Sequence, residues 1–522
     1  MSHLLERRRA GPQDGSPHNL KGDRSASRFA KLTAVGLGTV CLAIACVGSA
    51  WAQDADTKPA SADKEAAVAA KRKEAAVAFQ GLSDQDKKIL AERQNSVARL
   101  DNLMMKGFDI PVVPFEVSML EDAGGVRSTL AESGWSFDLI NSLNGADNLL
   151  KTHPTGGTQS YWGQIPSGQS STNLWVMYDL SRLGVPDGQL EFGGTYDVSS
   201  WQPYGQNRHV PNDLWWYQTA FDKALEIKVG YYFTNLDWIG TIIGGNLVNP
   251  LGANASIPFE MGMTTSTTSQ PSARVTWNIG SGFYNETGVL RSLPINGPTQ
   301  NPQLDDVHFN GSGLDWNVPN GKLLAMDEFG YKVRAHPGQG QTWLRAGVMY
   351  NESSFVDYSK FGVKGGVPGF GTKADITAEY VLADMQLEQF APSSIFSAYR
   401  GLYVGGSFMN APEKNLAFYR YFEGRAYVVG PFESRPLDQI AFSYSYSDVS
   451  HHLADTINSF SAFTNIHAVK EVSSITGTYT AHVYKGIFFT AGLSYTDNPT
   501  ITYQRGQKDS ALNLVSTMFT NF

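Results

Sequence analysis

Three stretches of the chain alternate between apolar and polar residues, and this period of two predicts β-strands rather than helices. In residues 440–447, Ile, Phe and Tyr alternate with Ala and Ser. Residues 474–483 place Ile, Tyr and Val between Ser and Thr, and residues 225–233 place aliphatic and aromatic side chains between Glu, Lys and Gly. Each strand therefore has one apolar face, which would point to the core of a soluble sandwich or to lipid in an outer-membrane barrel.

The length and number of these segments favour the membrane barrel. They run for about ten residues, which spans a bilayer when tilted, whereas strands of soluble proteins average about 5–6 residues. Tight turns alternate with long connections, a pattern typical of barrels with short periplasmic turns and long outer loops. The long connections are residues 142–171, 236–270, 292–324, 352–373 and 449–468. Sixteen segments begin near residues 134, 172, 189, 213, 224, 271, 283, 325, 341, 374, 399, 415, 438, 469, 486 and 508.

We therefore predict an all-β fold: a 16-stranded antiparallel transmembrane outer-membrane β-barrel (residues 134–522), with a short N-terminal α-helical segment. Backbone groups in lipid must all be hydrogen-bonded, so the last strand, which ends at Phe522, must close on the first. A strand number of fourteen or eighteen is the alternative.

The N-terminus has the pattern of a secretory signal. Residues 32–50 form an apolar run that basic residues precede and Ala50-Trp51-Ala52 follows. We predict a signal peptide over residues 1–52, cleaved after Ala52; the rival interpretation is an uncleaved membrane anchor. Both cysteines, Cys41 and Cys46, lie in this leader, so the exported chain would have neither disulfides nor cysteine metal ligands.

Residues 53–107 differ from the rest of the chain. From residue 58 to residue 106 they are rich in Ala, Lys, Glu, Gln and Asp, which are mostly strong helix formers, and Leu and Ile recur on seven-residue tracks. We predict a periplasmic helical, coiled-coil-like segment here. It would be either a solvated helix at the barrel mouth or a short coiled coil that associates subunits or touches the cell wall. Residues 108–133, which include Pro111 and Pro114, are predicted to be a linker.

Composition and charge exclude several classes. Charged residues make up only 17% of the chain and there are 52 glycines, which disfavours a coiled-coil rod or an acidic disordered protein. The formal net charge is −8 although the leader is basic, so the exported part is more acidic still and nucleic acid is not expected as a partner.

The third long connection, residues 236–270, is unusually apolar for a surface loop. It contains Ile, Leu, Val and Phe together with several glycines, and exposing such a loop to water would be unfavourable. We expect it to fold inward and narrow the pore, with Trp238 as a stacking platform; the alternative is a loop that caps the rim. The pore-lining and constriction candidates carry both signs of charge and two indole rings, and they are Glu191, Asp197, Trp201, Glu226, Lys228, Asp237, Trp238, Arg274, Glu328, Arg334, Arg345 and Glu379.

Other motifs do not indicate chemistry. The glycines of residues 362–371 resemble a phosphate loop but lack the strand–helix context, so a flexible loop is expected. His451 and His452 have no third ligand at helical spacing. We expect no catalytic residues, no metal site and no cofactor, and hence no enzyme.

Four blocks of sequence and the closing strand resemble the carbohydrate-selective porin family (OprB type). The blocks are residues 189–192 (QLEF), 224–230 (ALEIKVG), 401–408 (GLYVGGSF) and 431–440 (PFESRPLDQI), within a likeness that covers roughly residues 130–522. The resemblance implies a sixteen-stranded porin for sugar uptake, often glucose-preferring.

The function we predict is passive, selective diffusion of small carbohydrates such as monosaccharides across the outer membrane of a Gram-negative bacterium. The expected partners are the sugar solutes, outer-membrane lipid, the barrel-assembly machinery through Phe522, and further copies of the chain in a homo-oligomer. The alternatives are a general or non-sugar porin and a structural tether that uses the N-terminal helix. A barrel lipase or protease would need a nucleophile or an acid pair at the rim, and none is visible.

Overall fold

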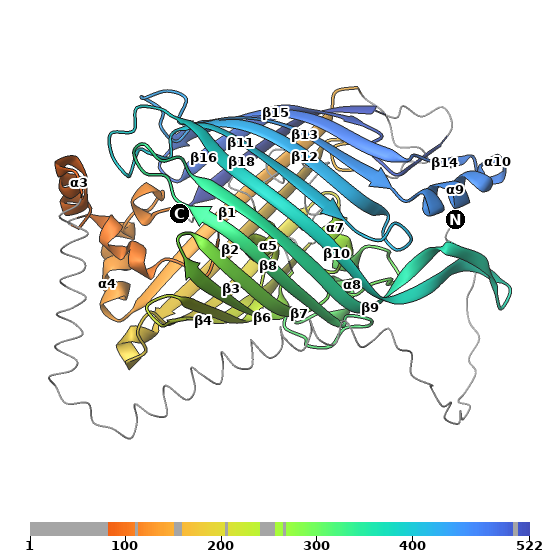
Figure 1. Cartoon of the computed structure of the whole chain (residues 1–522), viewed down its shortest axis with the longest axis horizontal. Helices are drawn as coiled ribbons and strands as arrows, with labels where there is room; N and C mark the ends of the chain where they lie inside the picture. The colour runs from red at the N-terminus through yellow and green to blue at the C-terminus, as the bar shows by residue number, and fades with distance from the viewer. Residues whose placement is uncertain are drawn as a thin grey trace, which may run out of the picture.

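The computed structural model describes residues 82–94, 96–109, 113–150, 159–203, 207–240, 256–264, 268–504 and 510–522. The predicted signal peptide, residues 53–81 of the predicted helical segment and residues 241–255 of the third loop lie outside the described residues. In Figure 1 a tilted barrel separates the N-terminal helices α3 (Asp84–Gln94) and α4 (Val126–Glu132) from α9 (His451–Ser459) and α10 (Ser461–Thr464) at the opposite end.

Sixteen of the described strands form one closed antiparallel barrel, as the sequence predicts, because β18 pairs with β1. A small separate sheet pairs β14 (Ile466–Ala468) with β17 (Thr502–Gln504). The barrel strands are β1 (Trp135–Asn148), β2 (Ser167–Asp179), β3 (Gln189–Ser199), β4 (Arg208–Ala220), β5 (Leu225–Tyr232), β6 (Gln270–Gly280), β7 (Phe283–Arg291), β8 (Leu323–Val333), β9 (Thr342–Lys364), β10 (Val367–Gln389), β11 (Gly401–Asn410), β12 (Phe418–Val429), β13 (Gln439–Val449), β15 (Glu471–Tyr484), β16 (Ile487–Asp497) and β18 (Ser510–Asn521).

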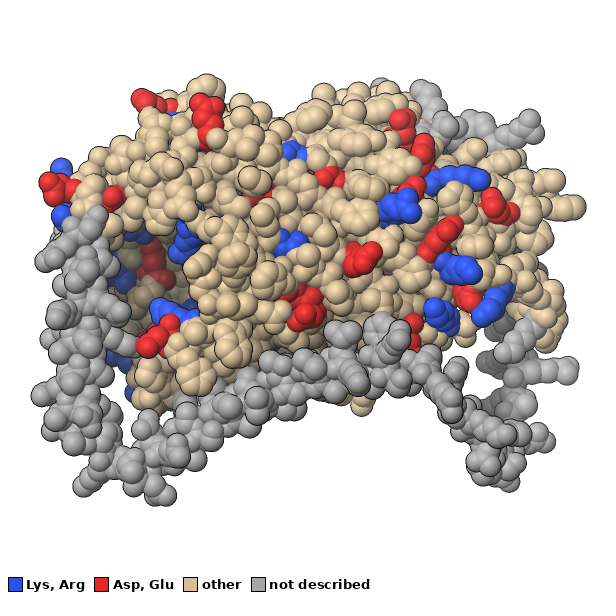
Figure 2. Space-filling view, in the orientation of Figure 1, with Lys and Arg blue, Asp and Glu red and all other residues tan. Residues whose placement is uncertain are grey.

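The alternating pattern places apolar side chains outside. On β13, Ile440, Phe442 and Tyr444 are exposed, whereas Ala441 and Ser443 between them are buried. The outer surface of the barrel is correspondingly poor in charge over most of its length in Figure 2. This is the arrangement of a barrel whose outside meets hydrocarbon and whose inside carries the polar groups.

Two turns at the end where β1 begins are only two residues long, and the longest connections lie at the other end. The turn between β6 and β7 is residues 281–282, and that between β15 and β16 is residues 485–486, whereas residues 233–269 separate β5 from β6. In the predicted orientation, the end with the short turns is periplasmic.

One predicted loop is a strand hairpin instead. Residues 352–373 continue β9 and β10, which pair beyond the rim as far as Lys364 opposite Val367. Gly365 and Gly366 have positive φ angles of 61° and 82° and form the turn. Because glycine adopts this conformation without strain, the glycines that indicate a flexible loop in the sequence allow a tight hairpin here.

In the described part of the predicted helical segment, α3 is followed by a 3₁₀ turn, and it packs on the barrel. The helix ends at Gln94, because Ser96 caps a 3₁₀ turn, η1 (Val97–Leu103), by accepting a hydrogen bond from the amide of Ala98. Asp86 of α3 accepts one from the amide of Ile395 at 3.0 Å, in the turn between β10 and β11. Within the described part of the chain, no helix is long and apolar enough to cross a bilayer.

The predicted linker folds against the seam where the barrel closes. Arg127 of α4 donates hydrogen bonds to the carbonyls of Phe137 on β1 and Phe522 after β18, the latter at 2.6 Å. Its guanidinium also lies 4.3 Å from the centre of the Phe115 ring. The amide of Met119 donates to the carbonyl of Asn521 at 2.8 Å. The segment is thus tied to both strands that close the barrel.

Adjacent residues on β1 test which face of the wall meets lipid. Leu143 is 41% exposed on the outer face, whereas Ser142 is half-buried on the opposite face. Leu143→Arg should destabilise the barrel by about 2–4 kcal/mol, because a charge would face the hydrocarbon, and Ser142→Arg should cost much less. Urea titration of folding into lipid vesicles measures both free energies. Equal losses would contradict the assigned faces.

Candidate functional site: a charged arc inside the barrel

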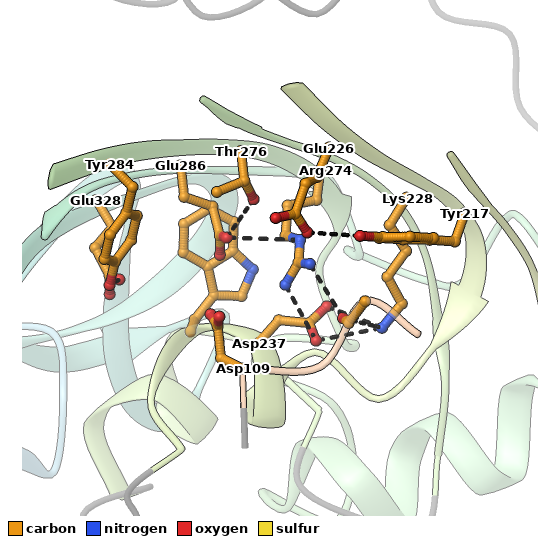
Figure 3. Close-up of polar contacts among 12 residues, drawn as sticks. Asp109, Tyr217, Glu226, Lys228, Asp237, Arg274, Thr276, Tyr284, Glu286 and Glu328 are labelled. Atoms are coloured by element: carbon orange, nitrogen blue, oxygen red, sulfur yellow. Dashed lines mark hydrogen bonds and ion pairs between the residues drawn. The ribbon is translucent and has the colours of Figure 1, made fainter. Parts of the chain in front are cut away.

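Charged side chains from five consecutive strands meet on the inner wall. They form what we call the charged arc, which consists of Lys228 (β5), Arg274 (β6), Glu286 (β7), Glu328 (β8) and Arg345 (β9). The strand register explains the cluster, because Lys228 lies opposite Arg274 and Glu286 lies opposite Glu328 in neighbouring strands. All five are buried within the barrel. In Figure 3, Lys228 and Arg274 extend from the wall toward the carboxylate of Asp237, and Asp109 lies nearby.

The carboxylate of Asp237 comes from α5 (Asn235–Trp238), in the third loop. Its two oxygens each lie 3.2 Å from Lys228 Nζ, and Oδ1 lies 3.3 Å from Arg274 Nη1. Arg274 Nε also lies 3.6 Å from Glu286 Oε2. The side chain of Asp237 is fully buried, as is that of Lys228. One loop carboxylate therefore forms ion pairs with two adjacent cations of the wall.

Aromatic rings surround the ammonium of Lys228. Its Nζ lies 4.1 Å from the ring centres of Phe108 and Tyr232, and 4.4 Å from the ring of Trp215. A cation over aromatic faces gains about 2 kcal/mol or more when it is desolvated. These rings, together with Asp237, replace the water that a buried ammonium loses.

The other half of the arc is a hydrogen-bonded set around Glu328. Its two carboxylate oxygens accept hydrogen bonds from the hydroxyls of Tyr284 at 2.6 Å and Tyr380 at 2.8 Å. Trp343 Nε1 donates to the Tyr284 hydroxyl at 2.9 Å. Its ring lies between two cations, 4.1 Å from Lys332 Nζ and 3.7 Å from the guanidinium carbon of Arg345. These contacts fix the side chains of β7 to β10 relative to one another.

Arg345 connects this half of the arc to the third loop. It donates to the carbonyl of Trp238 at 3.0 Å and to the carbonyl of Gly240. The two acceptors lie at the last residue of α5 and just beyond it, where backbone carbonyls are left without helical partners. The arc therefore holds the C-terminal end of α5 through Asp237 and through these carbonyls.

The described residues of the third loop, 236–240, 256–264 and 268–270, lie on the inner wall, in agreement with the inward fold that the apolar sequence predicts. Ile239, Ile257, Met261 and Met263 are buried in one cluster with inward-facing side chains of β7 to β12. Burying apolar side chains stabilises by roughly 25 cal/mol per Å². The described part of the loop is thus held on the inner wall by this cluster and by the charged arc.

A second segment enters the lumen from the periplasmic end. We call residues 103–109 the strap. The carbonyl of Gly107 accepts hydrogen bonds from Lys228 Nζ at 3.2 Å and Arg274 Nη2 at 3.0 Å. Asp109 forms an ion pair with Lys332 at 3.1 Å. Although burial opposes its ionisation, Lys332, Arg274 and Arg345 hold the pKa of Asp109 below its ordinary value. The strap thus contacts the same cations as the third loop.

Several predicted pore residues lie together at this site. Lys228, Asp237 and Arg274 are in direct contact, and Glu328 and Arg345 complete the arc. Glu226 lies toward the periplasmic end, where its carboxylate accepts hydrogen bonds from Tyr217 at 2.8 Å and Asn278 at 3.0 Å. Glu191 is fully buried on the inner wall of β3.

Four candidates lie elsewhere. Asp197 accepts a hydrogen bond from Gln169 at 2.8 Å, and Trp201 packs on the cluster of Ala146, Trp162 and Val515 beyond the outer end of β3. Arg334 is exposed just after β8, at the periplasmic rim. Glu379 does not line the lumen as predicted: it is exposed beside the buried Tyr380, which takes the inward position of the alternation.

The predicted role of Trp238 is also wrong. Its side chain is 1% exposed and its ring packs on β7, where a Cβ added to Gly288 would lie 2.5 Å from Trp238 Cζ2. The indole is therefore an anchor between the loop and the wall, with no face free for a solute. The sequence shows that this tryptophan belongs to an apolar loop, but not which surface it meets.

The sequence analysis missed further residues of the site. Glu286 and Tyr284 share the inward face of β7 at a spacing of two, a signal that the alternation of that strand could have provided. The strap has no such periodicity, and Gly107 acts through its backbone carbonyl, which leaves no mark in the sequence. Also missed was an inner cluster in which Arg425 (β12) holds Asp384 (β10) at 2.6 Å and Glu423 at 2.7 Å.

A closed sixteen-stranded antiparallel barrel with a loop packed on its inner wall has the architecture of an outer-membrane porin. Residues 115–518 match the model of the carbohydrate-selective porin, OprB family, and the chain belongs to this family. It is thus a carbohydrate-selective porin of the Gram-negative outer membrane.

The fold is similar to that of a solved porin structure. The high-pH structure of Pseudomonas putida OprB superposes with a TM-score of 0.62 at 18% sequence identity, covering 78% of this chain and 98% of that one. The low-pH structure of the same protein covers the same shares at 17% identity, with a TM-score of 0.45. No curated protein matches the chain.

Asp237→Asn tests the ion pairs that hold the third loop. Removing the carboxylate leaves Lys228 and Arg274 buried without their main counter-charge, and breaking a buried pair in this way costs about 3–5 kcal/mol. We expect a lower melting temperature and a noisier, larger single-channel conductance. The control is Asp455→Asn, which removes an exposed ion pair with Lys470 and should change stability by at most about 1 kcal/mol. Indistinguishable variants would contradict the anchoring role.

Glu260, in the third loop, should make the stability of the protein depend on pH. In α7 (Ser256–Glu260), its carboxylate accepts hydrogen bonds from the amides of Ala417 at 2.7 Å and Phe418 at 3.1 Å, and burial raises its pKa to about 7. Between pH 4.5 and about 7 the folded protein keeps a proton that the unfolded chain releases. Stability should therefore fall as pH rises through this window, by at most about 3 kcal/mol.

Melting curves in detergent at pH 5 and pH 8 measure this effect. Glu260→Gln should make the pH dependence across the window less steep than in the parent protein. Glu433→Gln, at an exposed position in a periplasmic turn, should leave it unchanged. A pH slope that persists in the Glu260 variant would assign the effect to other groups.

Proposed function

We propose that the protein admits small neutral carbohydrates such as monosaccharides by passive diffusion past the charged arc, and that it catalyses no reaction. The observation that carries this proposal is the balance of charge around the arc. Four cations, Lys228, Arg274, Lys332 and Arg345, face four carboxylates, those of Asp109, Asp237, Glu286 and Glu328.

Such a site has no dominant sign, unlike the single-charge rings of ion-selective channels. An inorganic ion of either sign meets repulsion as close as attraction. A sugar brings no charge of its own, so it can pass the arc without competing for the ion pairs that hold these buried side chains. The interleaved arrangement thus favours a neutral solute such as a sugar over ions.

The partners follow from the same proposal. The solute is a small carbohydrate, and the apolar outer face is in contact with outer-membrane lipid. The barrel-assembly machinery would recognise the last strand, which ends at Phe522, and association with further copies of the chain stays a prediction.

A planar-bilayer measurement tests the proposed solute. Glucose should reduce the single-channel current with saturation, because it occupies a site. Arg345→Gln should weaken this block at least fivefold, because it removes a cation of the arc and two hydrogen bonds to the third loop. Lys470→Gln, at an exposed residue of an outer loop, is the control. A small, unsaturable reduction that is equal in all three proteins would indicate a general porin instead.

A further inference from the structure

A cavity lies on the periplasmic side of the charged arc, between the strap and the wall. Its volume is about 760 Å³, within the range of about 300–1,000 Å³ typical of small-molecule sites. The wall contributes residues near the periplasmic ends of β4 to β9, and the strap contributes Met105 to Asp109. In Figure 2 the end of the molecule that carries α3 is hollowed, and charged side chains are visible inside.

The polar groups of this cavity have the chemistry of a saccharide site. Glu226 is held between the hydroxyl of Tyr217 and the amide of Asn278, a fixed carboxylate with acceptor capacity left for a hydroxyl donor. Arg334 also lines the cavity, and among the described residues no carboxylate pairs with it. It offers a free guanidinium donor. Figure 3 shows Tyr217, Glu226 and Asp109 around this side of the arc.

The strap supplies the apolar floor and closes one side. Phe108 packs edge-on against Trp215 with ring centres 5.5 Å apart, and it covers the ammonium of Lys228. Met105 lies beside it in the lining. A pyranose has apolar C–H faces and equatorial hydroxyls. Its C–H faces could pack on the apolar floor, while its hydroxyls bond to the fixed polar groups opposite.

Hydrogen bonds and a close approach at Gly107 hold the strap in the lumen. The amide of Lys106 donates to Gln189 Oε1 at 2.9 Å, and Ser136 donates to the carbonyl of Leu103 at 2.5 Å. Gly107 has a φ of +80°, and a Cβ there would lie 2.8 Å from the ring of Tyr217. Only glycine therefore fits this close approach, which lets the Gly107 carbonyl reach Lys228 and Arg274.

We propose that the strap and the periplasmic ends of β4 to β9 enclose a second saccharide site, the exit site, which holds a neutral monosaccharide after it has passed the charged arc. This inference rests on the proposed carbohydrate function. Because the strap forms one side of the exit site, binding of the sugar there depends on the strap being docked in the lumen. The strap acts on release from the pore, whereas the third loop acts on passage through it.

Current-noise analysis with glucose in planar bilayers tests the exit site through the residence time of the sugar. Gly107→Val has no room beside Tyr217 and should displace the strap. It should raise the conductance and shorten the glucose residence time at least fivefold. Gly124→Val is the matched control, because Gly124 also has a positive φ (+68°) but open space around its Cβ. Its conductance and residence time should equal those of the parent protein.

Two further variants keep the test decisive if the valine variant does not fold. Phe108→Ala removes the floor, and Asn278→Ala removes the donor that holds Glu226; each should shorten the residence time without abolishing the block. If the parent protein is blocked by glucose and all three variants keep its residence time, the exit site is refuted while the carbohydrate function stands. If glucose blocks none of the proteins, including the parent, the carbohydrate function itself fails.

Discussion

Two cations on adjacent strands, Lys228 and Arg274, impose the constraint on which the interior of this barrel depends. They lie opposite each other in the ladder and are both buried, so they repel each other in a medium that screens poorly. Removing an ion from water costs several kcal/mol unless a counter-charge and hydrogen bonds replace its hydration. Asp237 supplies the charge and the Gly107 carbonyl supplies the hydrogen bonds. The third loop and the strap therefore both bind to the same two cations inside the barrel.

The closed barrel makes this interior possible. Closure satisfies the backbone of β1 and β18 and forces side chains to alternate between lipid and lumen, so the charges of five strands must face inward. The lumen thereby becomes a polar cavity that loops and termini can enter. Arg127 adds a clamp at the closing seam through the carbonyls of Phe137 and Phe522, which places the start of the barrel beside its end. Wall, loop and strap then form one connected polar network around Lys228 and Arg274.

The sequence predicts the parts of this structure that repeat. Predicted strand starts such as residues 189 and 283 coincide with β3 and β7, because a period of two extends over whole strands. The inward position of the described third-loop residues follows from the apolar sequence of the loop. Asp237, a predicted pore residue, lies beside Lys228 and Arg274. Single contacts are harder to predict. The burial of Trp238 depends on the missing side chain of Gly288 on another strand, and the strap binds through a carbonyl that every residue has. Glycines 365 and 366 permit either a loop or a hairpin, and pairing with the neighbouring strand decides between them.

The most direct test of this account is a double-mutant cycle on the pair of Lys228 and Asp237. The free energy of unfolding would be measured by urea titration in lipid vesicles for the parent protein, Lys228→Met, Asp237→Asn and the double variant. If the carboxylate holds the third loop by its ion pairs with the wall, the double variant should lose less stability than the sum of the single losses, with a coupling energy of about 1–3 kcal/mol. Losses that add to within about 0.3 kcal/mol would show that the two groups act independently, which would contradict the central role assigned to the pair.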